Sequence, residues 1–412
     1  MKWPRRISPA GTRVSFRDFI ATLFGVVIQP NPRTRLTDEV KRHFGVTNAF
    51  LTNSGRSALV VILKAIFEGD TRNEILIPAY TCFSVPSAIK KAGLKIRLID
   101  LREETLDYDF NQLEKAITSK TLAILLVYPF GLGCDIRRAQ KIARDHGIYL
   151  IEDAAQSMGL KISGQFAGTI GDVGLFSLSK GKPITSMRGG IIVTKDEKLA
   201  QKIAGQMEGL PRAGWAQSLR VLIEAKVIWF FLRPGLFWVI GKLPFVKLGE
   251  THYEPMMKVT QMPRAAAILC RRMLPRLDAI NEARAKTSMV YLDRMSKSPN
   301  LSPITGCEPE TSRFLRLPVL CANHAAREKL ADELVDWGAS RMYRESLAAI
   351  DDPDLFAAGQ LPAGSFPGAT KIAQCLLTLP THVYVTEKDI DGILQKIQTL
   401  TPNPRSSSHV SH

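Results

Sequence analysis

The chain has 412 residues, which at about 150 residues per domain allows two to three domains with large cores. Apolar residues make up 45% and charged residues 23%, values that exclude a disordered chain, a collagen-like chain and a heptad-repeat rod. The formal net charge of +16 favours anionic partners such as phosphorylated metabolites, acidic membrane surfaces or nucleic acid. The sequence contains no basic run interleaved with aromatics and no helix-turn-helix pattern, so we expect no nucleic-acid partner.

Six cysteines lie far apart and include no C-x-x-C pair, so the sequence predicts neither a zinc cluster nor a disulfide framework. Reduced, mostly buried thiols are expected instead, as in a cytoplasmic protein. No group of His, Asp and Glu residues has the spacing of a metal site, and we expect no metal. The N-terminus is basic, but Arg13, Arg17 and Asp18 interrupt the apolar patch that follows it, which argues against an export signal.

After an N-terminal segment, residues 1–34, a large domain is expected over residues 35–264. Between residues 51 and 194, short β-branched runs alternate with amphipathic stretches, as in a mostly parallel central sheet flanked by helices. The pattern predicts strands at residues 74–79, 95–100, 122–128, 149–153, 174–177 and 190–194. Apolar residues at helical spacing predict a helix over residues 135–146, which Gly147 ends. The fold class is therefore α/β.

Residues 265–401 are predicted to form a long helix and a smaller α/β C-terminal domain. The long helix spans residues 265–294 with a bend at Pro275, because proline removes a helical hydrogen bond. Two further helices are expected at residues 325–337 and 388–399. Residues 402–412 are polar and rich in serine, which predicts a flexible tail.

An aromatic insert in the large domain, residues 218–248, contains Trp229 and Trp238 among several phenylalanines. Its charged residues leave no apolar run near the roughly 20 residues that a membrane span requires, and Pro234 divides it into two short amphipathic pieces. Two interpretations remain open. The insert is a helical hairpin that covers the active site or completes a dimer interface, or its aromatic and basic side chains lie in a membrane interface. The second interpretation would place a cytoplasmic protein peripherally at the inner membrane face.

Three short elements carry groups that suit one kind of chemistry. Residues 54–57, with the sequence S-G-R-S, begin an apolar helix and place hydroxyls and free N–H groups at its positive end, which favours phosphate. Asp153 ends a strand, at the edge where open α/β sheets bind ligands, and Lys182 lies in a short loop after another strand. Taken alone, residues 54–57 and Asp153 also fit ordinary helix caps, and Lys182 also fits a surface lysine. Together they supply an amine, an anion for a pyridinium nitrogen and a phosphate seat, which pyridoxal phosphate requires.

The order and spacing of these elements resemble the DegT/DnrJ-type sugar aminotransferases, which use pyridoxal phosphate and have the fold type I architecture of aspartate aminotransferase. The resemblance covers residues 51–194 and recurs near residues 379–390. It rests on S-G-R-S-A-L at 54–59, I-P-A-Y-T at 77–81, I-E-D-A-A-Q-S-M-G at 151–159, G-D-V-G-L-F-S-L-S-K-G-K at 171–182, L-P-T-H at 379–382 and T-E-K-D-I at 386–390. The E-D-A-A-Q block followed by S-x-x-x-x-K is the specific part of this pattern.

By this resemblance, Lys182 is the catalytic lysine, which binds the cofactor covalently and moves protons. Lys180 is the weaker candidate, because it falls three residues after Ser177 instead of five. Asp153 matches the carboxylate that pairs with the ring nitrogen of the cofactor, and Gln156 matches the amide near its 3-oxygen. A lysine is retained where the dehydratase branch of the family has histidine, so the resemblance implies amino transfer.

The resemblance also implies that Gly55, Arg56 and Ser177 bind the phosphate of the cofactor, with Ser57 as a further cofactor-binding residue. Arg56 stands where the family more often has a small hydroxyl residue. Two more cofactor contacts are expected at Cys82 and Phe83.

Four departures from the family pattern affect the substrate more than the cofactor. Cys82 stands where an aromatic residue stacks on the ring, which leaves Tyr80 or Phe83 as substitutes. Met158 replaces a histidine, and residues 187–190 replace an acidic turn. The asparagine motif that reaches across to the partner subunit is not recognisable at residues 261–264.

The resemblance implies a homodimer that transfers an amino group, with glutamate as donor, to a nucleotide-linked keto-sugar. Such amino-sugars enter surface polysaccharide, glycan or secondary-metabolite biosynthesis. The alternative is a catalytically inactive descendant that acts as a regulator or a membrane-associated assembly protein. The altered turn and the aromatic insert favour that alternative, whereas the retained Lys182, Asp153, Gln156 and Ser177 favour the enzyme.

Overall fold

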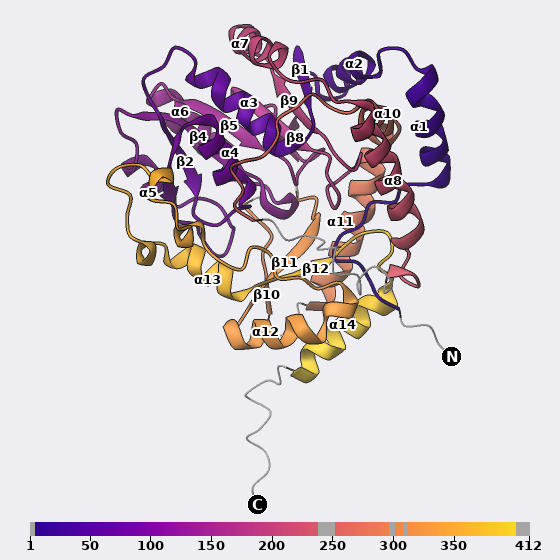
Figure 1. The fold of residues 1–412 in the computed structure, drawn as a ribbon. Helices are drawn as coiled ribbons and strands as arrows, with labels where there is room; N and C mark the ends of the chain where they lie inside the picture. Colours follow the sequence, from indigo (N-terminus) through magenta and orange to yellow (C-terminus); the bar gives the residue numbers. More distant parts are fainter. Residues whose placement is uncertain (1–4, 238–251, 296–300, 308–311, 401–412) are drawn as a thin grey trace, which may run out of the picture.

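The computed structural model describes residues 5–237, 252–295, 301–307 and 312–400. A central sheet with surrounding helices forms the upper part of the molecule in Figure 1, and C-terminal elements in orange and yellow lie below it. The predicted α/β fold, with a large, mostly parallel sheet and a smaller C-terminal sheet, is confirmed. The predicted tail and residues 238–248 of the aromatic insert lie outside the described residues.

Seven strands form the central sheet in the order β1-β9-β8-β5-β4-β2-β3. The five strands from β8 to β3 run parallel, whereas β9 pairs antiparallel with both β8 and β1. Their bounds are β1 Asn48–Thr52, β2 Glu74–Pro78, β3 Lys95–Ile99, β4 Thr121–Val127, β5 Tyr149–Asp153, β8 Val173–Ser177 and β9 Gly190–Thr194. The six predicted strands are all present, and no end is shifted by more than one residue. The edge strand β1 was not predicted.

Helices pack against this sheet and connect its strands. Their bounds are α1 Phe16–Ile28, α2 Pro32–Phe44, α3 Gly55–Phe67, α4 Ser84–Ala92, α5 Phe110–Lys115, α6 Ile136–Asp145, α7 Glu197–Glu208 and α8 Trp215–Phe231. The predicted helix at residues 135–146 is α6, and Asp135 caps it by accepting a hydrogen bond from the Arg138 amide at 3.0 Å. A two-stranded hairpin, β6 Lys161–Ile162 and β7 Gln165–Phe166, follows β5.

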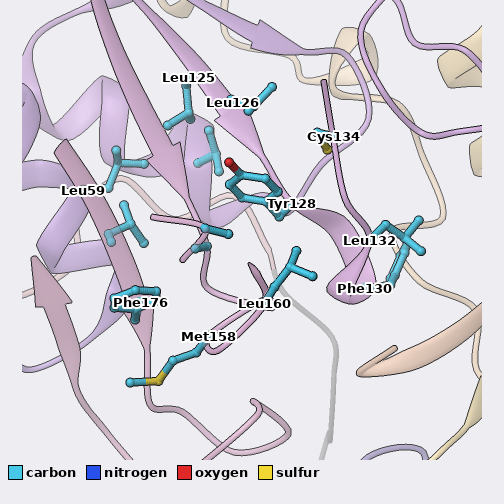
Figure 2. Packing of buried hydrophobic residues seen from close by; sticks show 14 of the residues in the cluster. Leu59, Leu125, Leu126, Tyr128, Phe130, Leu132, Cys134, Met158, Leu160 and Phe176 are labelled. Carbon is cyan, nitrogen blue, oxygen red and sulfur yellow. The ribbon is translucent and has the colours of Figure 1, made fainter. Parts of the chain in front are cut away.

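Strand β4 and the turn after it supply much of the buried core. Figure 2 shows Leu125, Leu126, Tyr128 and Phe130 from this region, with Phe176 of β8 in the same cluster. All five side chains are almost completely buried. β4 is central in the sheet, so both of its faces are covered, which explains its uninterrupted apolar sequence.

Glu152 is a buried carboxylate inside β5, and its role is structural. Its Oε1 accepts hydrogen bonds from the amides of Ile170 and Gly171 at 2.6 Å, and its Oε2 accepts one from the Tyr128 hydroxyl at 2.5 Å. Burial raises the pKa of this carboxyl group, and these donors oppose the rise. Glu152 therefore fixes the loop before β8, and the neighbouring Asp153 is left to face the ligand edge of the sheet.

The C-terminal part begins with the predicted long helix, which the structure divides into α10 Arg264–Met273, the 3-10 turn η2 Leu274–Arg276 and α11 Leu277–Met295. Pro275 lies in the turn, where the bend was predicted. The small antiparallel sheet has the order β10-β11-β12. The remaining elements are β10 Leu301–Pro303, β11 Arg316–Cys321, α12 His324–Glu333, η4 Val335–Trp337, α13 Pro367–Cys375, β12 Leu376–Pro380 and α14 Glu387–Leu400. The two predicted C-terminal helices correspond to α12 with η4 and to α14.

Candidate functional site

A cavity of about 740 Å³ opens at the carboxyl ends of the parallel strands. Tyr128 lines it directly after β4, Asp153 at the end of β5 and Ser177 at the end of β8. The N-terminus of α3 closes another side with Gly55. This is the edge at which open α/β sheets bind ligands, because successive strands direct their loops to the same place.

The cavity brings together seven of the nine residues predicted for the site. They are Lys182, Asp153, Gln156, Ser177, Gly55, Arg56 and Cys82. The other two lie elsewhere: Ser57 is buried behind the α3 N-cap, and Phe83 precedes α4 and packs against the core. Neither Tyr80 nor Phe83, the two substitutes for a stacking aromatic, is among the lining residues.

The structure distinguishes the two candidate lysines. Lys182 lines the cavity, and its amine has no hydrogen bond or ion pair within the described part of the chain. Burial lowers the pKa of Lys182, and nearby Arg316 lowers it further, against the opposing effects of Cys82 and Asp153. Lys180 is exposed, and its amine lies 3.5 Å from the carboxylate of Glu224 on α8. Only Lys182 therefore offers a free amine with a pKa shifted toward the neutral form.

Asp153 presents a carboxylate with one free oxygen. Its Oδ1 accepts a hydrogen bond from the Ala155 amide at 3.0 Å, whereas its Oδ2 has no hydrogen-bond partner among the described residues. Burial raises the pKa of Asp153, and the Ala155 amide and Lys182 act in the opposite direction. A cationic ring nitrogen of a ligand would stabilise the charged form of this carboxylate.

Gln156 is held in the cavity wall by hydrogen bonds at both ends of its amide. Its oxygen accepts from the Phe130 amide at 3.1 Å, and its nitrogen donates to the Tyr343 hydroxyl at 3.0 Å. Tyr343 comes from the loop after η4, and its hydroxyl also hydrogen-bonds Cys82. Tyr343 was not predicted as a site residue, because no local pattern links this loop to the E-D-A-A-Q block.

The start of α3 forms a small polar seat. Ser54 caps the helix by accepting a hydrogen bond from the Ser57 amide at 3.1 Å, which leaves the first amides of the helix without an intrahelical partner. Ser177 and Ser179 face this end of the helix, with their hydroxyl oxygens 3.2 Å apart. Free amides, hydroxyls and the positive end of a helix suit a phosphate group. The donor set of the cavity therefore fits pyridoxal phosphate.

Adding one methyl group at Gly55 should weaken phosphate binding, because the seat has no spare room. A Cβ at Gly55 would lie 2.8 Å from the Cβ of Ser177. We expect Gly55→Ala to weaken the affinity for pyridoxal phosphate about 10- to 100-fold, the equivalent of roughly 1–3 kcal/mol of overpacking. Equilibrium titration followed by absorbance measures the affinity. Gly205→Ala in α7 is the matched control, since its added Cβ meets nothing within 4 Å. Equal affinities for both variants would contradict this description of the seat.

Hydrogen bonds from segments far away in the chain hold the loop that carries Lys182 in place. The Thr12 hydroxyl donates to the Lys182 carbonyl at 2.8 Å. Arg284 of α11 donates to the Pro183 carbonyl and to the Thr12 hydroxyl, both at 2.9 Å, and is almost completely buried. These positioning residues were not predicted, because hydrogen bonds between segments so far apart in the chain leave no local sequence pattern.

His382 of the L-P-T-H stretch holds the N-terminal segment that contributes to these hydrogen bonds. Its Nε2 lies 2.8 Å from the Ser8 carbonyl, and its Nδ1 accepts from the Tyr384 amide at 3.4 Å, so the fold stabilises the neutral ring. Burial lowers the pKa of His382 from 6.5 to about 4. Unfolding therefore takes up a proton between these pH values, and stability falls as the pH falls through this range.

We expect the contribution of His382 to the free energy of unfolding to decrease by about 3 kcal/mol as the pH falls from above 6.5 to about 4. Urea unfolding of the wild type and of His382→Gln at several pH values measures this contribution as the difference between the two proteins. Glutamine keeps a donor but does not titrate. A difference that is constant with pH would show that His382 is not held neutral by the fold.

The turn that departs from the family pattern has a local explanation. Arg188 donates to the Glu224 carboxylate at 2.7 Å, and Arg220 of the same helix, α8, donates to it at 3.1 Å. Arg188, Arg220 and Gln217 also line the cavity. Arg220, in the first half of the aromatic insert, therefore reaches the site, whereas the hairpin of the first interpretation extends into residues outside the described part of the chain.

A family model for the DegT/DnrJ/EryC1/StrS aminotransferase family matches residues 25–398. The chain belongs to this family. Over 345 residues it is 35% identical to a protein of Geobacillus stearothermophilus named "Pleiotropic regulatory protein", covering 84% of this chain and 82% of that one. It is also 34% identical to a GDP-perosamine synthase of Escherichia coli O157:H7 over 175 residues, 41% of this chain and 47% of the synthase.

The chain spans about half the length of several curated relatives that it matches, as with this synthase. Among solved structures, the fold is similar to that of Helicobacter pylori PseC, an aminotransferase involved in pseudoaminic acid biosynthesis, with a TM-score of 0.77. That match covers 96% of this chain and 99% of PseC at 17% identity, so it supports the fold. The predicted family and its fold type are thus confirmed, and the site residues rest on the geometry described above.

Proposed function

We propose that the protein is a pyridoxal-phosphate-dependent aminotransferase that moves an amino group from glutamate to a nucleotide-linked keto-sugar. The observation that carries this assignment is that Lys182 and Asp153 line the same cavity. Within the described residues, the Lys182 amine and the Asp153 Oδ2 have no hydrogen-bond or ion-pair partner. A structural role for these two groups would have supplied such partners, because buried polar groups are otherwise hydrogen-bonded.

When bound, pyridoxal phosphate supplies an electron-withdrawing ring that makes the Cα–H bond of an amino acid acidic. Asp153 would hold the ring nitrogen in its protonated form, and Gln156 would donate to the ring oxygen. The lowered pKa of Lys182 favours a neutral amine, so its Nζ is able to accept a proton from Cα and return it to another carbon. Gly55, Arg56 and Ser177 would hold the phosphate.

Support for a nucleotide-linked substrate comes from the charge of the cavity lining. Arg56, Arg188, Arg220 and Lys258 all line the cavity, whereas its acidic residues are Asp153 and Glu254. Glu254 lies 3.3 Å from Arg56, and Glu224 behind the lining pairs with both Arg188 and Arg220. These four cations therefore face two carboxylates, and the remaining positive charge would attract a diphosphate group. The name of the matched GDP-perosamine synthase points to the same substrate class, with amino-sugars for polysaccharide or secondary-metabolite synthesis as products.

We further propose that the active form is a homodimer, as the family resemblance implies, and that it works in the cytoplasm. No helix within the described residues is long and apolar enough to cross a membrane. Sedimentation of the purified protein tests the dimer: a concentration-independent monomer would contradict it.

The decisive test of the function is a substrate panel. The protein loaded with pyridoxal phosphate is incubated with L-glutamate and with UDP-, dTDP- or GDP-linked keto-sugars, and 2-oxoglutarate is measured. We expect turnover with at least one sugar and none with the Lys182→Ala variant. If the purified protein does not bind the cofactor and no sugar yields 2-oxoglutarate, the second candidate is favoured, a regulator without this activity. The match to a protein named as a regulator is the observation on which that candidate rests.

A further inference from the structure

Helix α1 exposes several large apolar side chains, whereas the residues that it buries are small or polar. The residues turned inward are Asp18, Thr22 and Gly25. Phe24, Val27 and Ile28 are 60%, 82% and 72% exposed, respectively. A surface helix of a soluble protein normally has the opposite arrangement, because burying the apolar stripe stabilises it. Something else must therefore stabilise α1 in this orientation.

Ion pairs of one buried carboxylate hold α1 in place. The Asp18 carboxylate is completely buried and pairs with Arg276 at 2.6 Å and with Arg272 at 3.0 Å. Arg264 of α10 donates to the backbone carbonyl of Val26 at 2.8 Å. These contacts anchor the polar face of α1 on α10 and η2, so the outward direction of its apolar face is built into the fold.

Helix α8 of the aromatic insert extends the same apolar surface. Figure 1 shows α1, α8 and α10 side by side, and the rings of Phe16 in α1 and Trp229 in α8 are 4.8 Å apart. Trp215 is 78% exposed, and further exposed side chains follow it at helical spacing. We define the α1–α8 surface by its exposed large apolar residues: Phe16, Leu23, Phe24, Val27 and Ile28 of α1, with Trp215, Leu219, Ile223, Val227 and Phe230 of α8.

The charges on and next to this surface are positive. The only carboxylates of the two helices are Asp18, which is buried, and Glu224, which is paired with three cations. Exposed cations lie on the two helices or within four residues of their ends: Arg13, Arg17, Arg212, Arg220, Lys226 and Arg233. An apolar face with aromatic side chains and a cationic border suits the interface of an anionic bilayer, which takes up the apolar side chains and attracts the charges.

We propose that the α1–α8 surface binds the protein peripherally to anionic lipid membranes. A second copy of the chain fits this surface less well. A two-fold interface would place the surface against itself, and its cationic borders would then face each other. Gln217 and Arg220 of α8 also line the cavity, so docking would place the cavity about one helix diameter, roughly 10 Å, from the lipid.

Vesicle flotation of the full chain tests this proposal. We expect the wild type to float with phosphatidylcholine vesicles that contain 30% phosphatidylglycerol, and at least tenfold less protein to float with pure phosphatidylcholine. Phe24→Glu and Ile223→Glu should each reduce binding to the anionic vesicles at least tenfold. Lys226→Glu, which leaves the apolar face intact, should weaken binding by a smaller factor. Met289→Glu is the matched control, since Met289 is 66% exposed on α11, outside the surface, and binding should be unchanged.

Circular dichroism and sedimentation without lipid accompany the flotation. Phe24→Ser, a milder change, keeps the test valid if a glutamate variant does not fold. Wild type that stays unbound, or Phe24 and Ile223 variants that float as well as the wild type, would overturn the proposal. Loss of a wild-type oligomer in those variants without lipid would also overturn it, because the surface would then be an interface between copies. The outcome is independent of the aminotransferase function, which the substrate panel tests separately.

Discussion

Replacing Lys182 with alanine is expected to reduce amino transfer from L-glutamate by about 10⁴-fold, because the variant loses the group that moves the proton. The free amine of Lys182 in the cavity, with a pKa lowered mainly by burial, is the basis for this expectation. Single-turnover absorbance changes of the cofactor-loaded protein measure the rate. The phosphate seat at Gly55 and Ser177 is not altered, so the variant should still bind pyridoxal phosphate, although more weakly.

Lys180→Ala is the matched control for this experiment. Lys180 is only two residues away, but its amine pairs with Glu224 and lies on the exposed side of the loop. Its replacement should change the rate by less than about threefold, as expected for an exposed ion pair of little energetic value. If Lys180→Ala lost activity and Lys182→Ala kept it, the two lysines would be assigned the wrong way round.

Asp153→Asn is expected to lower the rate by about 10³-fold with little change in the fold, since an amide has nearly the shape of a carboxylate but carries no charge. The amide would still accept the hydrogen bond from the Ala155 amide through its oxygen. It would no longer stabilise a protonated ring nitrogen, so the electron-withdrawing power of the cofactor would fall. The same single-turnover assay measures the effect.

Asp153→Glu separates charge from position. It restores the negative charge on a longer side chain, and we expect it to recover part of the activity lost in Asp153→Asn. Full activity of the asparagine variant would contradict the pairing of Asp153 with the ring nitrogen. The Met257→Leu variant, which changes an apolar side chain of the cavity lining that has no proposed role in binding, controls for general disturbance of the lining.

Most of the central sheet could be predicted from the sequence, because its buried parallel strands are short apolar runs that stand out from the amphipathic stretches between them. β1 was missed for a physical reason. It is an edge strand whose burial pattern is mixed, so it lacks the continuous apolar sequence of β4. The bend at Pro275 was predictable, because proline acts locally on the backbone.

The cavity was predictable where its residues belong to local motifs. Asp153 and Ser177 end strands that the pattern had already located, and Gln156 and Lys182 follow those strands closely. Tyr343, by contrast, reaches the site from the C-terminal part of the chain through a contact with Gln156. Such contacts depend on how distant segments pack.

The outward direction of the apolar face of α1 could not be predicted from the sequence either. The sequence showed Arg17 and Asp18 as interruptions of an apolar patch, and only the fold reveals that Asp18 points inward toward Arg276. Which face of a helix is buried depends on the contacts that each face makes with the rest of the protein.

The central claim, that Lys182 binds pyridoxal phosphate beside Asp153, is tested most directly by locating the covalent bond. The cofactor-loaded protein is reduced with borohydride, digested and analysed by mass spectrometry. We predict a single pyridoxyl-modified lysine at position 182, and none in the Lys182→Ala variant. Modification at Lys180, or an unmodified chain after saturation with the cofactor, would contradict the account.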